Sequence, residues 1–138
     1  AFDAPVPWAV YTFPEIAGVG LTEQQAVKEN LPISIGTFPL GHLGKAMAAN
    51  HMEGFVKIIR HRETDRLLGV HMIGHNATEI IAVAGAMLGQ AATTRDLAET
   101  VFAHPTLSEA IKESAEDALK MALHLPPRKV IQVVAEPQ

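Results

Sequence analysis

The sequence predicts an α+β fold in which a mainly antiparallel sheet of about five strands packs against helices. Three observations lead to this prediction. Segments rich in β-branched and aromatic residues gather in the first half of the chain, and helical segments with capping signals gather in the second half. The apolar segments 54–61 and 67–74 are joined by the polar turn Arg62-Glu63-Thr64-Asp65, which is typical of a β-hairpin. Strands followed by helices favour an antiparallel layer fold over a parallel one.

The other elements of the first half follow from local pattern. Segments 9–13, 16–21 and 33–40 read as strands, because they are apolar and bounded by proline, glycine or polar residues. Thr22-Glu23-Gln24-Gln25 forms a capping box, which predicts a short helix to about Asn30. Segment 41–50 is left open between a loop and a helical turn.

The second half begins with a helix predicted from a capping box of Asn76 and Glu79 and extending to about Gln90. Its centre is apolar on nearly every side, so we expect it to be buried against a sheet or a partner chain. Thr93 and Asp96 form a similar signal for a short third helix.

A fourth helix is predicted from Thr106 and Glu109 to about Leu123, because Pro126-Pro127 stops it. We therefore expect one domain over residues 1–123, followed by a C-terminal tail over residues 124–138. Within this tail, Val130 to Val134 either adds a strand or stays mobile.

Composition excludes several classes of function. The 138 residues are 48% apolar and 19% charged, which fits one globular domain. A net charge of −4 without a basic cluster in sequence argues against nucleic-acid or membrane-surface binding. No cysteine is present, so the chain holds no disulfide, thiolate ligand or thiol nucleophile, and it fits a reducing compartment. The start of the chain lacks the basic region of a signal peptide and its first residue is Ala1, so we expect a fragment or a processed chain.

The candidate chemistry lies at His104-Pro105-Thr106-Leu107-Ser108-Glu109. A histidine stands just before a helix start and a carboxylate lies about one turn inside, so their side chains are able to meet. A carboxylate bonded to one imidazole nitrogen fixes the tautomer and leaves the other nitrogen as a base. Two simpler roles stay open: Glu109 as a capping residue only, and His104 as a solvent-facing residue. Pro105 holds His104 extended, and the His104-Pro105 bond is left open between cis and trans.

Further catalytic or binding motifs are weak. His71 and His75 would lie roughly 13 Å apart on one strand face, which is too far to hold one metal ion, and no metal site is predicted. Gly18-x-Gly20 lacks the spacing and strand-to-helix context of a dinucleotide fingerprint. Ser108 lacks the context of a hydrolase nucleophile.

Several segments, in order, resemble a known family. Residues 102–109 are similar to the carboxy-terminal active-site motif of dihydrolipoamide dehydrogenases, within the pyridine nucleotide-disulfide oxidoreductases. Residues 11–23 look like the opening of that family's dimerisation domain, and residues 54–57 and 66–74 look like its hairpin. The resemblance covers about residues 8–123. Leu107 and Ala110 favour the lipoamide branch over the glutathione reductases, which remain an alternative.

The resemblance implies an FAD- and NAD-dependent homodimer whose active sites are shared between subunits. His104 would be the base for a dihydrolipoyl thiol, Glu109 would orient it, and the backbone of His104 and Pro105 would approach the partner's flavin. Because the FAD, disulfide and NAD motifs are absent from this sequence, the fragment alone is expected to bind no cofactor and to be inactive.

Further partners implied are the FAD and NAD domains of the parent chain and lipoyl-bearing components of 2-oxoacid dehydrogenase or glycine cleavage complexes. Nucleic acid and membrane are not expected as partners. The location implied is the bacterial cytoplasm or the mitochondrial matrix. A stand-alone dimerisation or adaptor module without catalysis is a second alternative.

Overall fold

A single antiparallel sheet organises the chain, as predicted. The computed structural model describes residues 4–51 and 53–120. The strands are β1 (Trp8–Val10), β2 (Ile16–Gly20), β3 (Ile33–Pro39), β4 (Gly54–His61) and β5 (Leu67–Gly74), and their order in the sheet is β1-β2-β5-β4-β3. The hairpin of β4 and β5 has the predicted limits and forms the centre of the sheet. Because every pairing is antiparallel, the α+β prediction is confirmed.

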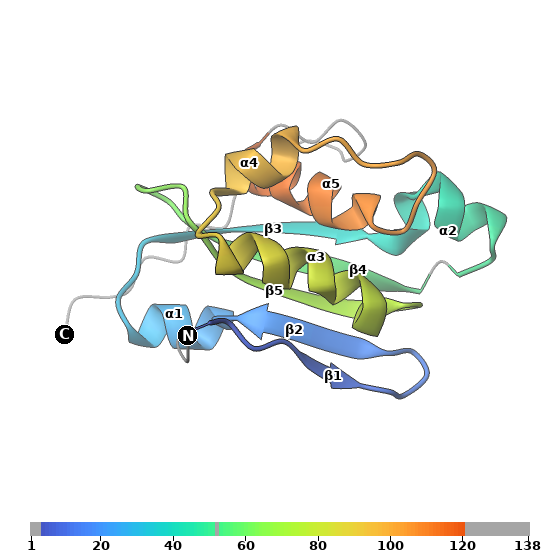
Figure 1. Ribbon diagram of the computed structural model, residues 1–138, viewed down its shortest axis with the longest axis horizontal. Coiled ribbons are helices and arrows are strands. Elements are labelled where there is room, and N and C mark those ends of the chain that lie inside the picture. Colours follow the sequence, from blue (N-terminus) through green and yellow to red (C-terminus); the bar gives the residue numbers. More distant parts are fainter. Residues whose placement is uncertain (1–3, 52, 121–138) are drawn as a thin grey trace.

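The three helices of the second half of the chain gather on one face of this sheet (Figure 1). Helix α3 (Ala77–Gly89) lies over β2 and β5, and α5 (Glu109–Ala118) lies over β3 and β4, with α4 (Thr94–Glu99) packed against α5. Between them lies the main core, which includes Val19, Val56, Ile58, Val70, Met72, Ile81 and Ile111. Because this core joins the sheet to both long helices, it fixes the position of α5 against the sheet, including the first residue of the helix, Glu109.

The opposite face of the sheet is covered at one end by α1 (Glu23–Lys28). Ala26 of this helix packs with Ile33 and Ile59, which point away from the main core because successive strand residues alternate between faces. Segment 41–50 includes the end of the short 3₁₀ helix η1 (Leu40–His42) and all of α2 (Gly44–Ala48), which settles the prediction left open there. Among the described residues, no helix is both long enough and apolar enough to cross a bilayer.

Two of the predicted capping boxes form completely. The backbone N–H of Thr22 donates to the side chain of Gln25 at 2.9 Å, and the N–H of Gln25 donates back to Thr22 Oγ1 at 3.1 Å. Thr93 and Asp96 make the same reciprocal pair at 2.8 and 3.0 Å. Both boxes involve residues three apart, so local sequence was sufficient to predict them.

The capping box predicted for α3 is wrong. Asn76 adopts a left-handed φ of 60° and its side chain makes no capping hydrogen bond. Instead the carboxylate of Glu15, from the turn between β1 and β2, accepts the Thr78 N–H at 3.0 Å and the Thr78 hydroxyl at 2.6 Å. These two hydrogen bonds hold the pKa of Glu15 below its usual value. A distant carboxylate thus replaces the local cap and ties α3 to the sheet.

Two predicted boundaries also differ. The first strand spans Trp8–Val10 instead of residues 9–13, because the chain turns before Pro14 and Thr12 donates to the Pro14 carbonyl at 2.8 Å. The last helix is shorter than the predicted 106–123: it begins at Glu109 and ends at Ala118, and Lys120 beyond it has a positive φ. The predicted stop at Pro126-Pro127 and the tail from residue 124 lie outside the described residues.

A close contact between β3 and α5 generates a stability prediction. A Cβ placed on Gly36 would lie 2.1 Å from the Ser114 carbonyl oxygen and 2.7 Å from the Ala118 Cβ, so Gly36→Ala forces α5 away from the sheet. We expect urea denaturation to show a loss of about 1–3 kcal/mol in the free energy of unfolding. The matched control is Gly44→Ala, where nothing lies within 4 Å, and it should be neutral or slightly stabilising. Equal effects of the two substitutions would contradict this packing.

Candidate functional site

The two residues singled out by the sequence meet in the structure. His104 Nδ1 lies 3.0 Å from Oε2 and 3.2 Å from Oε1 of Glu109. The imidazole is 78% exposed, whereas the side chain of Glu109 is 18% exposed. A fixed carboxylate therefore holds a ring whose second nitrogen, Nε2, is available to a molecule outside this domain.

Glu109 also has part of the capping role, which is compatible with this contact. Its Oε1 accepts the backbone N–H of Thr106 at 2.7 Å, as in a capping box. The Thr106 hydroxyl donates to the Ala103 carbonyl at 2.8 Å, and the residue that precedes the helix is Ser108, whose side chain makes no capping hydrogen bond. One carboxylate thus contacts both the loop backbone and the imidazole.

The loop between α4 and α5 is braced at both ends. Lys112 on α5 donates to the Thr100 carbonyl at 2.9 Å, where the loop begins. Leu107 packs against the main core, and Ala110 in the first turn of α5 is fully buried. His104 and Pro105 stand exposed between these anchors, and the peptide bond joining them is cis. The loop presents the imidazole outward from a rigid base.

Three other histidines have ring contacts of their own. His71 Nε2 lies 2.9 Å from the Leu21 carbonyl oxygen, and its ring lies against Trp8 with centroids 6.2 Å apart. His51 and His75 stack with ring centroids 3.9 Å apart, beside a cavity of about 180 Å³ that Glu15 also lines. In the part of the chain that the structure describes, no three histidine or acidic side chains are grouped to hold a metal ion. Sequence reasoning missed the stacked pair, because the two rings come from loops 24 positions apart.

The paired glycines do not form a phosphate-binding loop. Gly18 and Gly20 lie within β2 and pair with His71 and Gly69 of β5. The space above Gly18 is filled by the side chains of His71 and Trp8, which a Cβ there would meet at 2.4 and 2.6 Å. These glycines permit close packing of side chains over the sheet.

Comparison with known proteins identifies the family. Residues 6–115 match the model for the dimerisation domain of pyridine nucleotide-disulphide oxidoreductases. The chain belongs to this family. It is 46% identical over 124 residues to a dihydrolipoyl dehydrogenase of Thermus scotoductus, and 46% identical over 119 residues to a dihydrolipoamide dehydrogenase of Chaetomium thermophilum. These alignments cover 90% and 86% of this chain but only 27% and 24% of the relatives.

Solved structures agree with this assignment. The flavoprotein disulfide reductase RclA of Escherichia coli matches with a TM-score of 0.77 and 27% identity, over 81% of this chain and 26% of that one. LpdA of Mycobacterium tuberculosis matches with a TM-score of 0.75 and 30% identity, over 80% of this chain and 24% of that one. The chain thus spans about a quarter of the length of these proteins and corresponds to their dimerisation domain.

The contact between His104 and Glu109 predicts the tautomer of the ring. Because the carboxylate accepts at Nδ1, the neutral imidazole should carry its proton on Nδ1 and leave Nε2 unprotonated. Long-range ¹H–¹⁵N correlation spectra of the histidine side chains measure this directly. Glu109→Ala should abolish the preference, and Glu99→Ala on α4 should leave it unchanged. A proton on Nε2 in the unsubstituted chain would contradict the geometry.

Proposed function

We propose that this chain is the dimerisation domain of an FAD- and NAD-dependent dihydrolipoyl dehydrogenase and that it contributes His104 and Glu109 to an active site completed by another subunit. The observation that carries the proposal is an exposed imidazole held at Nδ1 by a mostly buried carboxylate. The dihydrolipoyl dehydrogenases among its relatives support the choice of substrate.

The domain supplies only part of the chemistry. It has no cysteine, so a redox-active disulfide must come from elsewhere in the parent protein. It has no glycine-rich phosphate loop among its described residues, and the one glycine pair lies inside a strand. FAD, held by other parts of the parent protein, would supply the redox chemistry that connects the disulfide to NAD. His104 and Pro105 are exposed, so their backbone is free to approach the flavin of another subunit.

His104 acts as the general base in this proposal. A free thiol has a pKa of about 8.5, so it needs a base to become a nucleophilic thiolate at neutral pH. The unprotonated Nε2 of His104 takes the thiol proton, and Glu109 holds the ring so that Nε2 faces outward. The resulting imidazolium then stabilises the thiolate formed when the disulfide opens. Glu109 is a positioning residue because it acts through the imidazole.

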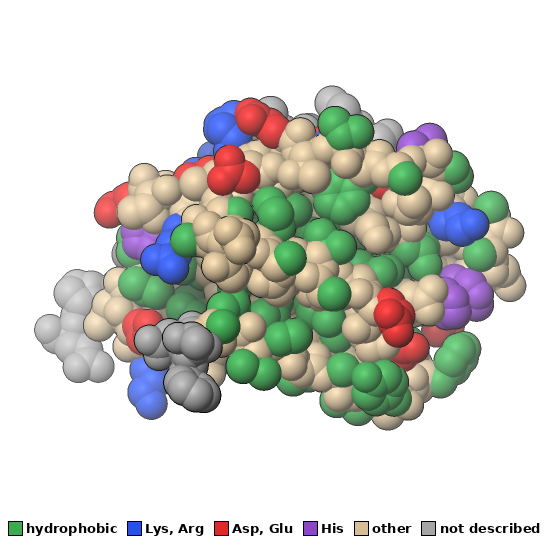
Figure 2. Space-filling model, in the orientation of Figure 1, with side chains coloured by type: hydrophobic (Ala, Val, Ile, Leu, Met, Phe, Trp, Pro, Cys, Tyr) green, Lys and Arg blue, Asp and Glu red, His purple; other side chains and the backbone are tan. Residues whose placement is uncertain are grey.

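The surface supports two contacts with the rest of a dimeric enzyme. Helix α3 exposes small apolar residues at Ala82, Ala86 and Gly89, and Figure 2 shows hydrophobic side chains along this helix. We assign this face of α3 to a second copy of the domain, because a contact with two-fold symmetry uses the same patch on both copies.

The second contact is on the face of the sheet opposite α3 and α5. Val10 and Phe55 are each 42% exposed on this face, and we assign it to the FAD and NAD domains of the parent chain.

The wider partners follow from the proposed substrate. Lipoyl-bearing components of 2-oxoacid dehydrogenase or glycine cleavage complexes would deliver the dihydrolipoyl group. Relatives include a bacterial protein of Bacillus subtilis and mitochondrial proteins of Arabidopsis thaliana and Dictyostelium discoideum. We therefore propose the bacterial cytoplasm or the mitochondrial matrix as the compartment.

Substitutions in the full-length enzyme test the two roles. His104→Gln should lower kcat for dihydrolipoamide oxidation by about 10²–10⁴, because it removes the general base. The flavin content and the melting temperature should stay close to those of the unsubstituted protein, because His104 lies outside the core of this domain. Glu109→Gln should cost less, because an amide oxygen still accepts a hydrogen bond. Near-normal turnover in His104→Gln would remove this residue from the catalytic role.

A further inference from the structure

A cavity lined by basic side chains lies at the far end of α5 from His104. Its volume is about 220 Å³, and its lining contains Ser34, Arg60, Arg62, Arg95, Ala118, Leu119 and Lys120. The four basic residues come from β4 (Arg60), the turn after β4 (Arg62), α4 (Arg95) and the segment just after α5 (Lys120). Such convergence is unexpected in a chain whose net charge is −4. Nothing in the proposed catalytic role uses this cavity.

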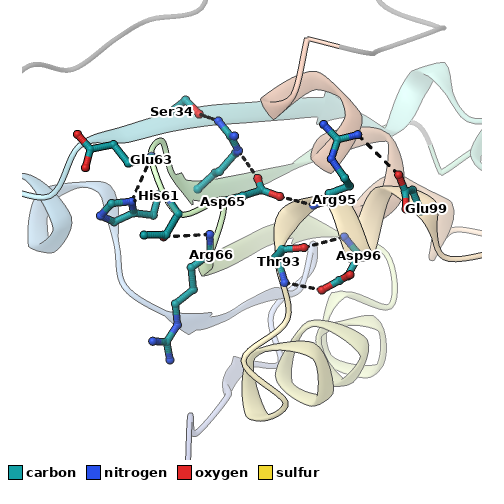
Figure 3. Close-up of polar contacts among 11 residues, drawn as sticks. Ser34, His61, Glu63, Asp65, Arg66, Thr93, Arg95, Asp96 and Glu99 are labelled. Atoms are coloured by element: carbon teal, nitrogen blue, oxygen red, sulfur yellow. Dashed lines mark hydrogen bonds and ion pairs between the residues drawn. The ribbon is translucent and has the colours of Figure 1, made fainter.

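One wall of the cavity is rigidly built (Figure 3). Arg60 forms an ion pair with Asp65, and its Nη1 lies 3.3 Å from the hydroxyl of Ser34, which is only 3% exposed. The second oxygen of Asp65 accepts the backbone N–H of Arg95 at 3.0 Å. Asp65 therefore uses both oxygens to hold Arg60 and the start of α4 together, so the wall is preorganised before any ligand arrives.

The charge of the lining is not balanced internally. Arg95 approaches Glu99 at 3.6 Å, but both side chains are more than half exposed and such pairs contribute little. Arg62 and Lys120 make no ion pair with an acid in the described part of the chain. Four cations therefore face two carboxylates, an excess of two positive charges. The carbonyl end of α5 offsets about half a charge of this excess.

We propose that this cavity binds a phosphate group, either as free inorganic phosphate or as a phosphate monoester. Guanidinium groups match the oxygens of such an anion in both charge and geometry. The lining offers the guanidinium groups of Arg62 and Arg95, the ammonium of Lys120 and the fixed wall of Arg60. Helix α5 has 10 residues, so the site lies about 15 Å along the helix from Glu109 and is separate from the catalytic pair.

An NMR titration of the 138-residue chain tests the site, with inorganic phosphate in one arm and adenosine monophosphate in the other. Ionic strength is held constant in both arms, because free salt screens surface charge. We expect saturable shifts of the backbone amides of Ser34, Arg62, Arg95 and Leu119, without shifts at Glu109. Tighter binding of the monophosphate would identify a monoester as the ligand, and tighter binding of inorganic phosphate would identify the free ion. Non-saturating shifts in both arms would overturn the proposal.

Two double variants with the same change in net charge distinguish phosphate binding in this cavity from nonspecific attraction between phosphate and a positively charged surface. The double substitution Arg62→Gln and Lys120→Gln should weaken binding about tenfold or more, because it removes two charged donors. Lys28→Gln with Lys45→Gln makes the same charge change at two residues that do not line the cavity, so it should alter the affinity by less than about twofold. Unchanged amide shifts elsewhere show that each variant folds. Equal weakening by the two double variants would overturn the proposal.

Discussion

The candidate site depends on two hydrogen-bonding contacts of the Glu109 carboxylate. This carboxylate accepts the Thr106 N–H at 2.7 Å and lies 3.0 Å from His104 Nδ1, so one side chain fixes both the loop and the ring. Glu109 is also the first residue of α5, whose inner residues Ala110 and Ile111 are fully buried against the sheet. The position of the imidazole therefore follows from the packing of α5, and a shift of this helix would move the ring with it.

An exposed histidine held by a carboxylate is suited to contact a molecule outside the domain. Holding His104 in one geometry costs side-chain entropy, and the domain gains little buried surface in return because the ring is 78% exposed. The proposed role offers a reason for this cost, since a face that meets another subunit in a family of dimerisation domains is exposed in the single chain. The absence of cysteine from the sequence agrees with a division of the chemistry between parts of a larger protein.

Local features of this fold were predictable from sequence, and contacts between distant segments were not. The hairpin of β4 and β5 and the caps at Thr22 and Thr93 depend on neighbours a few residues apart, and each was predicted correctly. The cap of α3 failed because its carboxylate comes from Glu15, 63 residues earlier. The basic cavity was missed for the same reason, because only the order of strands brings Ser34 and Arg60 beside α4. The contact of His104 with Glu109 followed from spacing, whereas its catalytic role rested on resemblance to a family.

Complementation between subunits of the full-length protein tests the central claim most directly. One subunit carries His104→Gln, and the other has an intact His104 but serine in place of the cysteines of the proposed redox-active disulfide. If His104 serves the neighbouring subunit, one of the two sites keeps every part, and the purified heterodimer should show about half of the wild-type turnover. If His104 serves its own subunit, both sites are broken, and a heterodimer no more active than the two parent homodimers would contradict the account.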